Sequence, residues 1–181
     1  MSVVIVIPAR FASTRYPGKP LVELRGAGGE ARSLIRRSWE AARQVRDVDR
    51  VIVATDDARI FDAARGFGAE AIMTDAACRN GTERCAAVIE ELGDDYDIIV
   101  NLQGDAPLTP PWFVSALVDA MRADPEARGL HLDIEADPAL TPATAFARHA
   151  RGLPAFLARA LEPGAGSRPI GALCALAAEP A

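Results

Sequence analysis

The sequence predicts an α/β fold in which a mostly parallel sheet is flanked by helices. Two observations favour this class. Short apolar runs alternate with helical patterns over the first two thirds of the chain, and the opening run at residues 2–7 is almost entirely apolar. A continuous apolar run is typical of a strand that is buried on both faces. A strand followed by a helix, repeated, implies parallel strands joined by right-handed crossovers.

The expected elements follow from hydrophobic spacing. Short apolar runs predict strands at residues 2–7, 51–55, 69–73 and 97–101. Apolar residues at helical spacing predict helices over residues 34–45, 60–67, 85–92 and 113–121. A glycine-rich stretch at residues 26–29 indicates a flexible connection before the first helix. Weaker strand patterns lie at residues 130–134 and 170–176.

The loop after the first strand is the most informative segment. It carries Arg10, Arg15 and Lys19, and open α/β sheets bind ligands at the carboxyl ends of their strands. Arginine clamps oxygens in pairs and lysine acts as a point charge, so three cations there suit a triphosphate. Ser13 and Thr14 in the same loop are equally compatible with phosphate contacts and with ordinary loop positions.

Polar residues follow the later strands as well. Asp105 comes shortly after the apolar run at residues 97–101, where its carboxylate could bind Mg²⁺. The weaker alternative is a turn aspartate bonded to its own backbone. Gln103 has an amide that suits a base or ribose edge. One of Asp56 and Asp57 is expected to cap the second helix.

The segment at residues 80–84 predicts the start of the third helix. Asn80 is the expected cap and Glu83, three residues on, its partner. A helix amino terminus also attracts anions. Arg79, just before it, could face either a ligand or solvent.

The bulk composition excludes several classes of protein. The 181 residues carry a net charge of −5, which argues against a nucleic-acid-binding domain held by a general positive field. No apolar run is long enough to span a membrane, and no signal-peptide pattern precedes Arg10. The three cysteines have no metal-type spacing, so reduced thiols in a cytoplasmic protein are expected.

Four segments together resemble a known family. Residues 7–21, 51–57, 80–84 and 100–108 resemble, in the same order, the motifs of sugar-activating cytidylyltransferases, above all the 3-deoxy-manno-octulosonate (KDO) cytidylyltransferases of lipopolysaccharide biosynthesis. The resemblance implies a Rossmann-like fold of the nucleotide-diphospho-sugar transferase type. It also implies transfer of CMP from CTP to KDO with release of pyrophosphate, in a cytoplasmic homodimer.

The resemblance carries roles to individual residues. It implies catalytic roles for Arg15, Lys19 and Asp105, with Mg²⁺ bound at Asp105. The nucleotide-binding residues that it implies are Pro8, Ala9, Arg10, Arg79, Asn80, Gly81 and Gln103. The family more often has Glu where Ala106 stands and often has His where Cys78 stands.

The last third of the chain matches the family poorly. Residues 1–125 are expected to form a nucleotide-binding α/β domain, and residues 126–181 an irregular, truncated or rearranged remainder of the sugar-binding and dimerisation part. A second metal-binding aspartate cannot be placed. Two alternatives therefore stay open: a truncated, non-catalytic CTP-binding relative, and a cytidylyltransferase for another sugar acid, such as 8-amino-KDO or a neuraminate-like compound. A dinucleotide-dependent oxidoreductase is disfavoured because no G-x-G-x-x-G follows the first strand.

Overall fold

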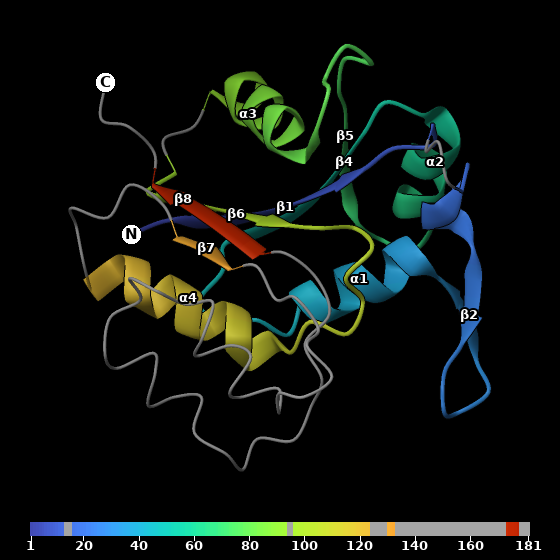
Figure 1. The fold of residues 1–181 in the computed structure, drawn as a ribbon, viewed down its shortest axis with the longest axis horizontal. Helices are drawn as coiled ribbons and strands as arrows, with labels where there is room; N and C mark the ends of the chain where they lie inside the picture. Colours follow the sequence, from blue (N-terminus) through green and yellow to red (C-terminus); the bar gives the residue numbers. More distant parts are fainter. Residues whose placement is uncertain (13–15, 94–95, 124–129, 133–172, 178–181) are drawn as a thin grey trace, which may run out of the picture.

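A six-stranded sheet forms the centre of the computed structural model, which describes residues 1–12, 16–93, 96–123, 130–132 and 173–177 (Figure 1). In spatial order its strands are β5 (Glu70–Met73), β4 (Arg50–Thr55), β1 (Val3–Ala9), β6 (Ile98–Leu102), β8 (Leu173–Ala177) and β7 (Leu130–Leu132). The helices are α1 (Leu34–Ala42), α2 (Ala58–Gly66), α3 (Gly81–Leu92), α4 (Pro111–Ala123) and the short 3-10 helix η1 (Lys19–Leu21).

The sheet is parallel over most of its width, as the sequence predicts. Strand β1 pairs in parallel with both β4 and β6, so that Ile5 lies between Val51 and Val100. The far side is antiparallel, because β8 runs against β6 and β7 runs against β8. The two weak strand patterns late in the sequence therefore correspond to β7 and β8. The other expectations for residues 126–181 fall largely outside the described residues.

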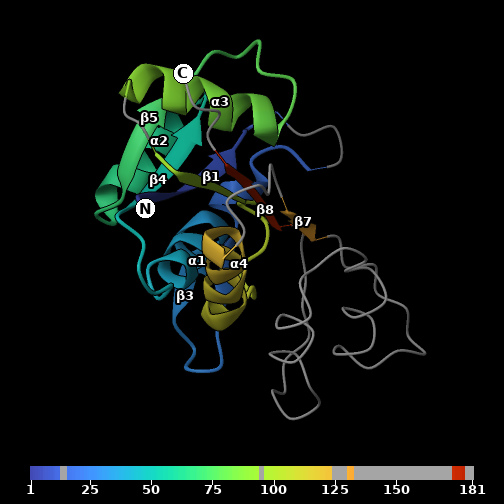
Figure 2. The same cartoon turned by 90° about the vertical axis from the view of Figure 1, so that its left-hand side faces the viewer.

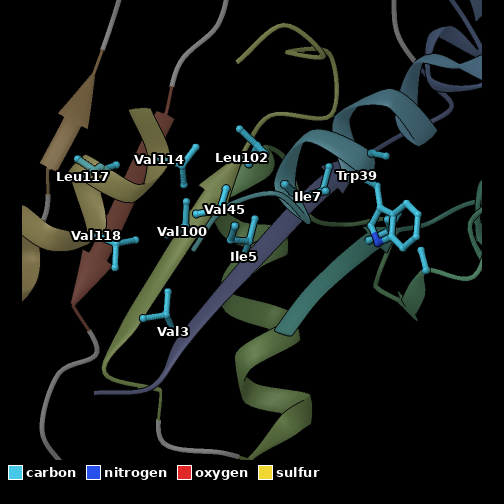
Figure 3. Close-up of a cluster of buried hydrophobic side chains, with 14 of the residues drawn as sticks. Val3, Ile5, Ile7, Trp39, Val45, Val100, Leu102, Val114, Leu117 and Val118 are labelled. Carbon is cyan, nitrogen blue, oxygen red and sulfur yellow. The ribbon is translucent and has the colours of Figure 1, made fainter. Parts of the chain in front are cut away.

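Helices cover both faces of the sheet. The side chains of β1 alternate between two cores, because successive residues of a strand point to opposite faces. Val3, Ile5 and Ile7 pack with α1, α2 and α4 (Figure 3). Val4 and Val6 pack with α3, which lies on the opposite side (Figure 2). Burial on both faces explains why the first strand reads as an unbroken apolar run.

Strand β1 runs two residues further than its apolar pattern predicts. Pro8 is part of the strand and pairs with Ala54 of β4. The last pair between β1 and β6 joins Val6 to Asn101, so the proline lies beyond that ladder. A proline is tolerated at such a position because no ladder hydrogen bond is lost there.

The connection before the first helix is a β-hairpin. Strands β2 (Glu23–Arg25) and β3 (Ala31–Ser33) pair antiparallel and project from the body of the structure (Figure 1). The glycines form the turn: Gly29 donates to the carbonyl of Gly26 at 2.9 Å and has a φ of +77°, which favours glycine. The sequence pattern does not predict this hairpin, because its strands are three residues long and largely exposed.

No helix in the described part of the chain combines the length and the apolar character that a membrane crossing requires.

Candidate active site

A cleft of about 860 Å³ opens at the carboxyl ends of β1 and β6. Its walls come from the end of β1, the loop that leads into η1, the turn after β6 and the start of α3. These elements meet because β1 and β6 are neighbouring parallel strands that end at the same edge of the sheet. The sequence predicts a ligand site at this edge.

Lys19 and Asp105 face each other across the cleft. The Nζ of Lys19 lies 2.7 Å from Oδ2 of Asp105, although the two residues are 86 positions apart in the chain. The side chains are 46% and 53% exposed, so both are accessible from solvent. An exposed ion pair of this kind contributes only about 0–1 kcal/mol to stability. The pair is therefore weak enough to be exchanged for contacts with a ligand.

The backbone just before η1 fixes the position of Lys19. Gly18 has a φ of +72° and donates its N–H to the carbonyl of Phe11 at 2.9 Å, which closes the loop between them. A Cβ at Gly18 would lie 3.0 Å from the ring of Phe11. Pro20 at the start of η1 adds its fixed φ. A backbone hydrogen bond and a proline thus restrain the turn that carries Lys19.

The turn after β6 holds Asp105 close to the core. The hydroxyl of buried Ser38 in α1 donates to the carbonyl of Gly104 at 2.8 Å. Gly104 has no room for a side chain, since a Cβ there would lie 2.8 Å from the carbonyl oxygen of Pro8. The amide of Gln103 donates to Oδ1 of Asn101 at 2.9 Å. Packing with α1 and β1 thus positions the two polar side chains on either side of Gly104.

The start of α3 forms the opposite wall and has the predicted cap. Oδ1 of Asn80 accepts the backbone N–H of Glu83 at 2.9 Å. The Glu83 carboxylate in turn accepts the backbone N–H of Arg79 at 2.8 Å and its Nε at 2.9 Å. These hydrogen bonds hold the pKa of the Glu83 carboxyl below its usual 4.5. Arg79 lines the cleft with its guanidinium paired to Glu83.

Gly81 brings α3 close to the other two walls. A Cβ at this position would lie 3.1 Å from Cγ of Pro8 and 3.2 Å from Nε2 of Gln103. Only a residue without a side chain allows this approach without movement of its neighbours. The first turn of α3, β1 and the turn after β6 therefore meet at Gly81.

The structure brings together nearly all of the residues that the sequence singles out. The predicted site residues that line the cleft are Pro8, Ala9, Arg10, Lys19, Arg79, Asn80, Gly81, Gln103 and Asp105. Arg15, Ser13 and Thr14 lie outside the described residues. Asp57 caps α2 by accepting the N–H of Arg59 at 3.0 Å, as predicted for one of the two aspartates. The roles in binding and catalysis remain predictions.

Sequence reasoning did not single out several residues of the cleft. The lining also includes Tyr16, Pro20, Val22, Leu24, Leu34, Cys78 and Gly104. Arg84 also lines it and is 2% exposed, with Nη2 2.9 Å from Oδ2 of Asp56. A signal for Arg84 exists in the sequence: it lies four positions before Val88, on the apolar face of the helix. A charge on such a face indicates a buried ion pair.

The sequence matches known proteins over most of the described residues. The model of the cytidylyltransferase family matches residues 4–148. Over 125 residues the chain is 53% identical to the 3-deoxy-manno-octulosonate cytidylyltransferase of Maricaulis maris (strain MCS10), a match that covers 69% of this chain and 46% of the relative. It is 47% identical over 125 residues to the mitochondrial enzyme of the same name from Arabidopsis thaliana, covering 69% and 41%.

Solved structures show the same likeness. CMP:2-keto-3-deoxy-manno-octonic acid synthetase complexed with CTP superposes with a TM-score of 0.66 at 42% identity, over 71% of this chain and 51% of that chain. A cytidylyltransferase from Leptospira borgpetersenii shares the fold, with a TM-score of 0.61 at 24% identity over 75% and 56%. The chain spans about half the length of these relatives. The family model covers most of the sequence, and on that evidence the chain belongs to the cytidylyltransferase family.

Proposed function

We propose that this chain binds CTP in the cleft and transfers CMP to KDO with release of pyrophosphate. The observation that carries the proposal is the meeting of Lys19 and Asp105, 2.7 Å apart, in a cleft lined by every described residue of the predicted nucleotide site. The names of the relatives and the CTP complex of a similar structure support this choice of substrates.

The residues of the cleft act by position and charge. Transfer of a nucleotidyl group needs the sugar hydroxyl in line with the α-phosphorus and a stabilised pyrophosphate. Lys19 supplies a positive charge for the phosphates. Arg10 adds a second positive charge, and Arg15 is predicted from the sequence to add a third. We assign the base and ribose of the nucleotide to the part of the cleft that Gln103 and the start of α3 border. In this arrangement the side chains of the cleft neutralise the charge of the phosphates and orient the substrates. No covalent intermediate on the protein is required.

We also propose that Asp105 holds Mg²⁺. The residues fit this ion: the carboxylate is half exposed to the cleft, and Mg²⁺ is commonly held by one or two carboxylates together with substrate phosphates and water. When bound, the ion neutralises charge on the phosphates. Lys19 would then exchange its contact with Asp105 for one with phosphate.

The biological setting belongs to the same proposal. The chain would serve lipopolysaccharide biosynthesis in the cytoplasm as a homodimer, as the family resemblance implies. Two alternative functions would replace this proposal: transfer of CMP to a different sugar acid, and binding of CTP without turnover. The discriminating assay measures pyrophosphate release from CTP with KDO, with 8-amino-KDO and with a neuraminate-like acid, each with and without Mg²⁺.

Lys19 offers a direct test of nucleotide binding, because it is the sole lysine in the sequence. An amine-selective reagent can modify only this side chain and the amino terminus. We expect CTP to protect Lys19 from modification, as measured by mass spectrometry of the peptides, while the amino terminus reacts as before. Equal labelling of Lys19 with and without saturating CTP would contradict the proposed site.

The matching variant is Lys19→Ala. Loss of one preorganised charge contact should lower turnover ~100-fold or more. Arg65→Met, which removes an exposed cation from α2 outside the cleft, should stay close to the parent. A Lys19→Ala variant within a few-fold of the parent would remove Lys19 from the mechanism.

A further inference from the structure

Arg84 is a buried charge that holds three elements together. It is the fourth residue of α3 and is 2% exposed. Its Nη2 lies 2.9 Å from Oδ2 of Asp56, and its Nη1 donates to the hydroxyl oxygen of Thr74. Asp56 directly follows β4, and Thr74 directly follows β5. One guanidinium therefore bonds the first turn of α3 to the carboxyl ends of both strands.

This contact is demanding in its geometry. The planar guanidinium presents its donors in a fixed fork, so two partners in different directions restrict its position. A buried arginine that loses its carboxylate leaves an uncompensated charge, which strongly disfavours any displacement. Thr74 is itself held next to Asp56, because its N–H donates to the carbonyl of Thr55, the residue before Asp56, at 2.8 Å. The bonds from Arg84 to Asp56 and Thr74 therefore hold the first turn of α3 in a defined position.

The same turn of α3 carries the wall of the cleft. Asn80 and Gly81 line it together with Arg84. Gly81 already lies at close contact distance from Pro8 and Gln103. A shift of the first turn toward them would create clashes, and a shift away would widen the cleft. The width of the cleft at this point therefore depends on where Arg84 holds the helix.

We propose that Arg84 is a positioning residue for nucleotide binding, which sets the distance between the first turn of α3 and the walls formed by Pro8 and Gln103. The inference rests on the proposed function, since it assigns the nucleotide to this cleft. Arg84 acts through the placement of Asn80 and Gly81. Its replacement weakens the binding of CTP beyond what the loss of stability alone explains.

The test uses three variants and one control. Arg84→Met removes both bonds, Arg84→Lys keeps the charge, and Asp56→Asn keeps an acceptor but removes the opposite charge. The control is Val118→Ala, which removes core contacts from α4 outside the cleft and lowers stability without touching α3 (Figure 3). Two quantities are measured for each protein: the dissociation constant for CTP by calorimetry, and amide hydrogen exchange in peptides that cover residues 80–85.

We expect Arg84→Met to weaken CTP binding about tenfold, the equivalent of one lost hydrogen bond in the cleft. Its first-turn amides in α3 should exchange faster than in the parent. Asp56→Asn should reproduce the weaker CTP binding and the faster exchange, and Arg84→Lys should show both to a smaller degree. Val118→Ala should keep the parent's exchange rates at residues 80–85. If Arg84→Met proves too unstable to purify, Arg84→Lys and Asp56→Asn provide the same comparison.

Three outcomes would overturn the inference. The first is a variant of Arg84 or Asp56 that binds CTP as tightly as the parent. The second is unchanged amide exchange at residues 80–85 in these variants. The third is an effect on CTP binding or exchange that Val118→Ala matches. Failure of the parent itself to bind CTP would refute the proposed function instead, and the exchange comparison would still decide whether Arg84 positions the helix.

Discussion

Gly104 is the residue whose replacement tests most directly how the walls of the cleft are packed. An alanine Cβ there would lie 2.8 Å from the carbonyl oxygen of Pro8 and 3.3 Å from Cδ1 of Ile35. The first distance is several tenths of an ångström short of an ordinary contact, so backbone must move. Neither backbone segment moves easily, because Pro8 is paired with Ala54 within the sheet and the carbonyl of Gly104 accepts a hydrogen bond from Ser38.

The size of the effect follows from these contacts. Overpacking of a close-packed site costs about 1–3 kcal/mol. Strain on the bond to Ser38 adds about 1 kcal/mol where the hydroxyl loses its partner. We expect Gly104→Ala to lower the free energy of unfolding by about 2–4 kcal/mol in urea titrations. In a protein of this size that lowers the melting temperature by roughly 2–4 °C for each kcal/mol.

The matched control is Gly66→Ala. Gly66 is the last residue of α2, and a Cβ there would meet nothing within 4 Å. Because alanine loses less backbone entropy on folding, this variant should be about 0.4–1 kcal/mol more stable than the parent. The two glycine-to-alanine changes thus have opposite expected signs. A Gly104→Ala protein as stable as the parent would refute the packing argument, since the close approach of the turn to β1 would then be unimportant.

Three further perturbations are predicted from the same structure. Ser38→Ala leaves the carbonyl of Gly104 without its buried donor. It should lower the free energy of unfolding, measured in urea titrations, by about 1–3 kcal/mol. Ser38→Cys should recover little of this lost stability. Gly18→Ala places a Cβ at a φ of +72° and 3.0 Å from the Phe11 ring, so its melting temperature should fall; an unchanged value would contradict the strained turn. Glu83→Gln concerns pH: hydrogen bonds from Arg79 hold the pKa of the Glu83 carboxyl below its usual 4.5 in the folded protein. Its stabilising effect is therefore complete above that usual value and is lost as the pH falls through the lower, folded value. Glu83→Gln should be less stable than the parent at pH 7, and the difference should shrink as the pH falls below 4.5. The check is the melting temperature across that range, and a difference that does not change with pH would reject the assignment.

Local patterns predict much of the fold. The apolar run at the start of the chain predicts β1, because a strand buried on both faces needs apolar residues at every position. The spacing of Asn80 and Glu83 predicts the start of α3, because a cap needs a side-chain acceptor at one defined position. Both features depend on neighbouring residues, and the structure confirms both.

Features that depend on distant residues are predicted less well. The sequence predicts that Lys19 and Asp105 lie at one edge of the sheet, but their 2.7 Å contact follows from the turn at Gly18 and the bond from Ser38. The role of Arg84 depends on Asp56, which follows β4 and lies 28 positions earlier in the chain. The hairpin from β2 to β3 was missed because short, exposed strands carry no alternating pattern. Arg15 lies outside the described residues, so its place in the cleft stays a prediction.

Strand β6 has a consequence for how the chain is made. Its outer side pairs with β8, whose residues come about seventy positions later in the sequence. A ribosome adding about 5–20 residues each second would leave that edge open for several seconds after β6 has emerged. Open strand edges recruit other chains. We therefore expect the nascent protein to need protection by a chaperone during this interval, and truncation before β8 to promote aggregation.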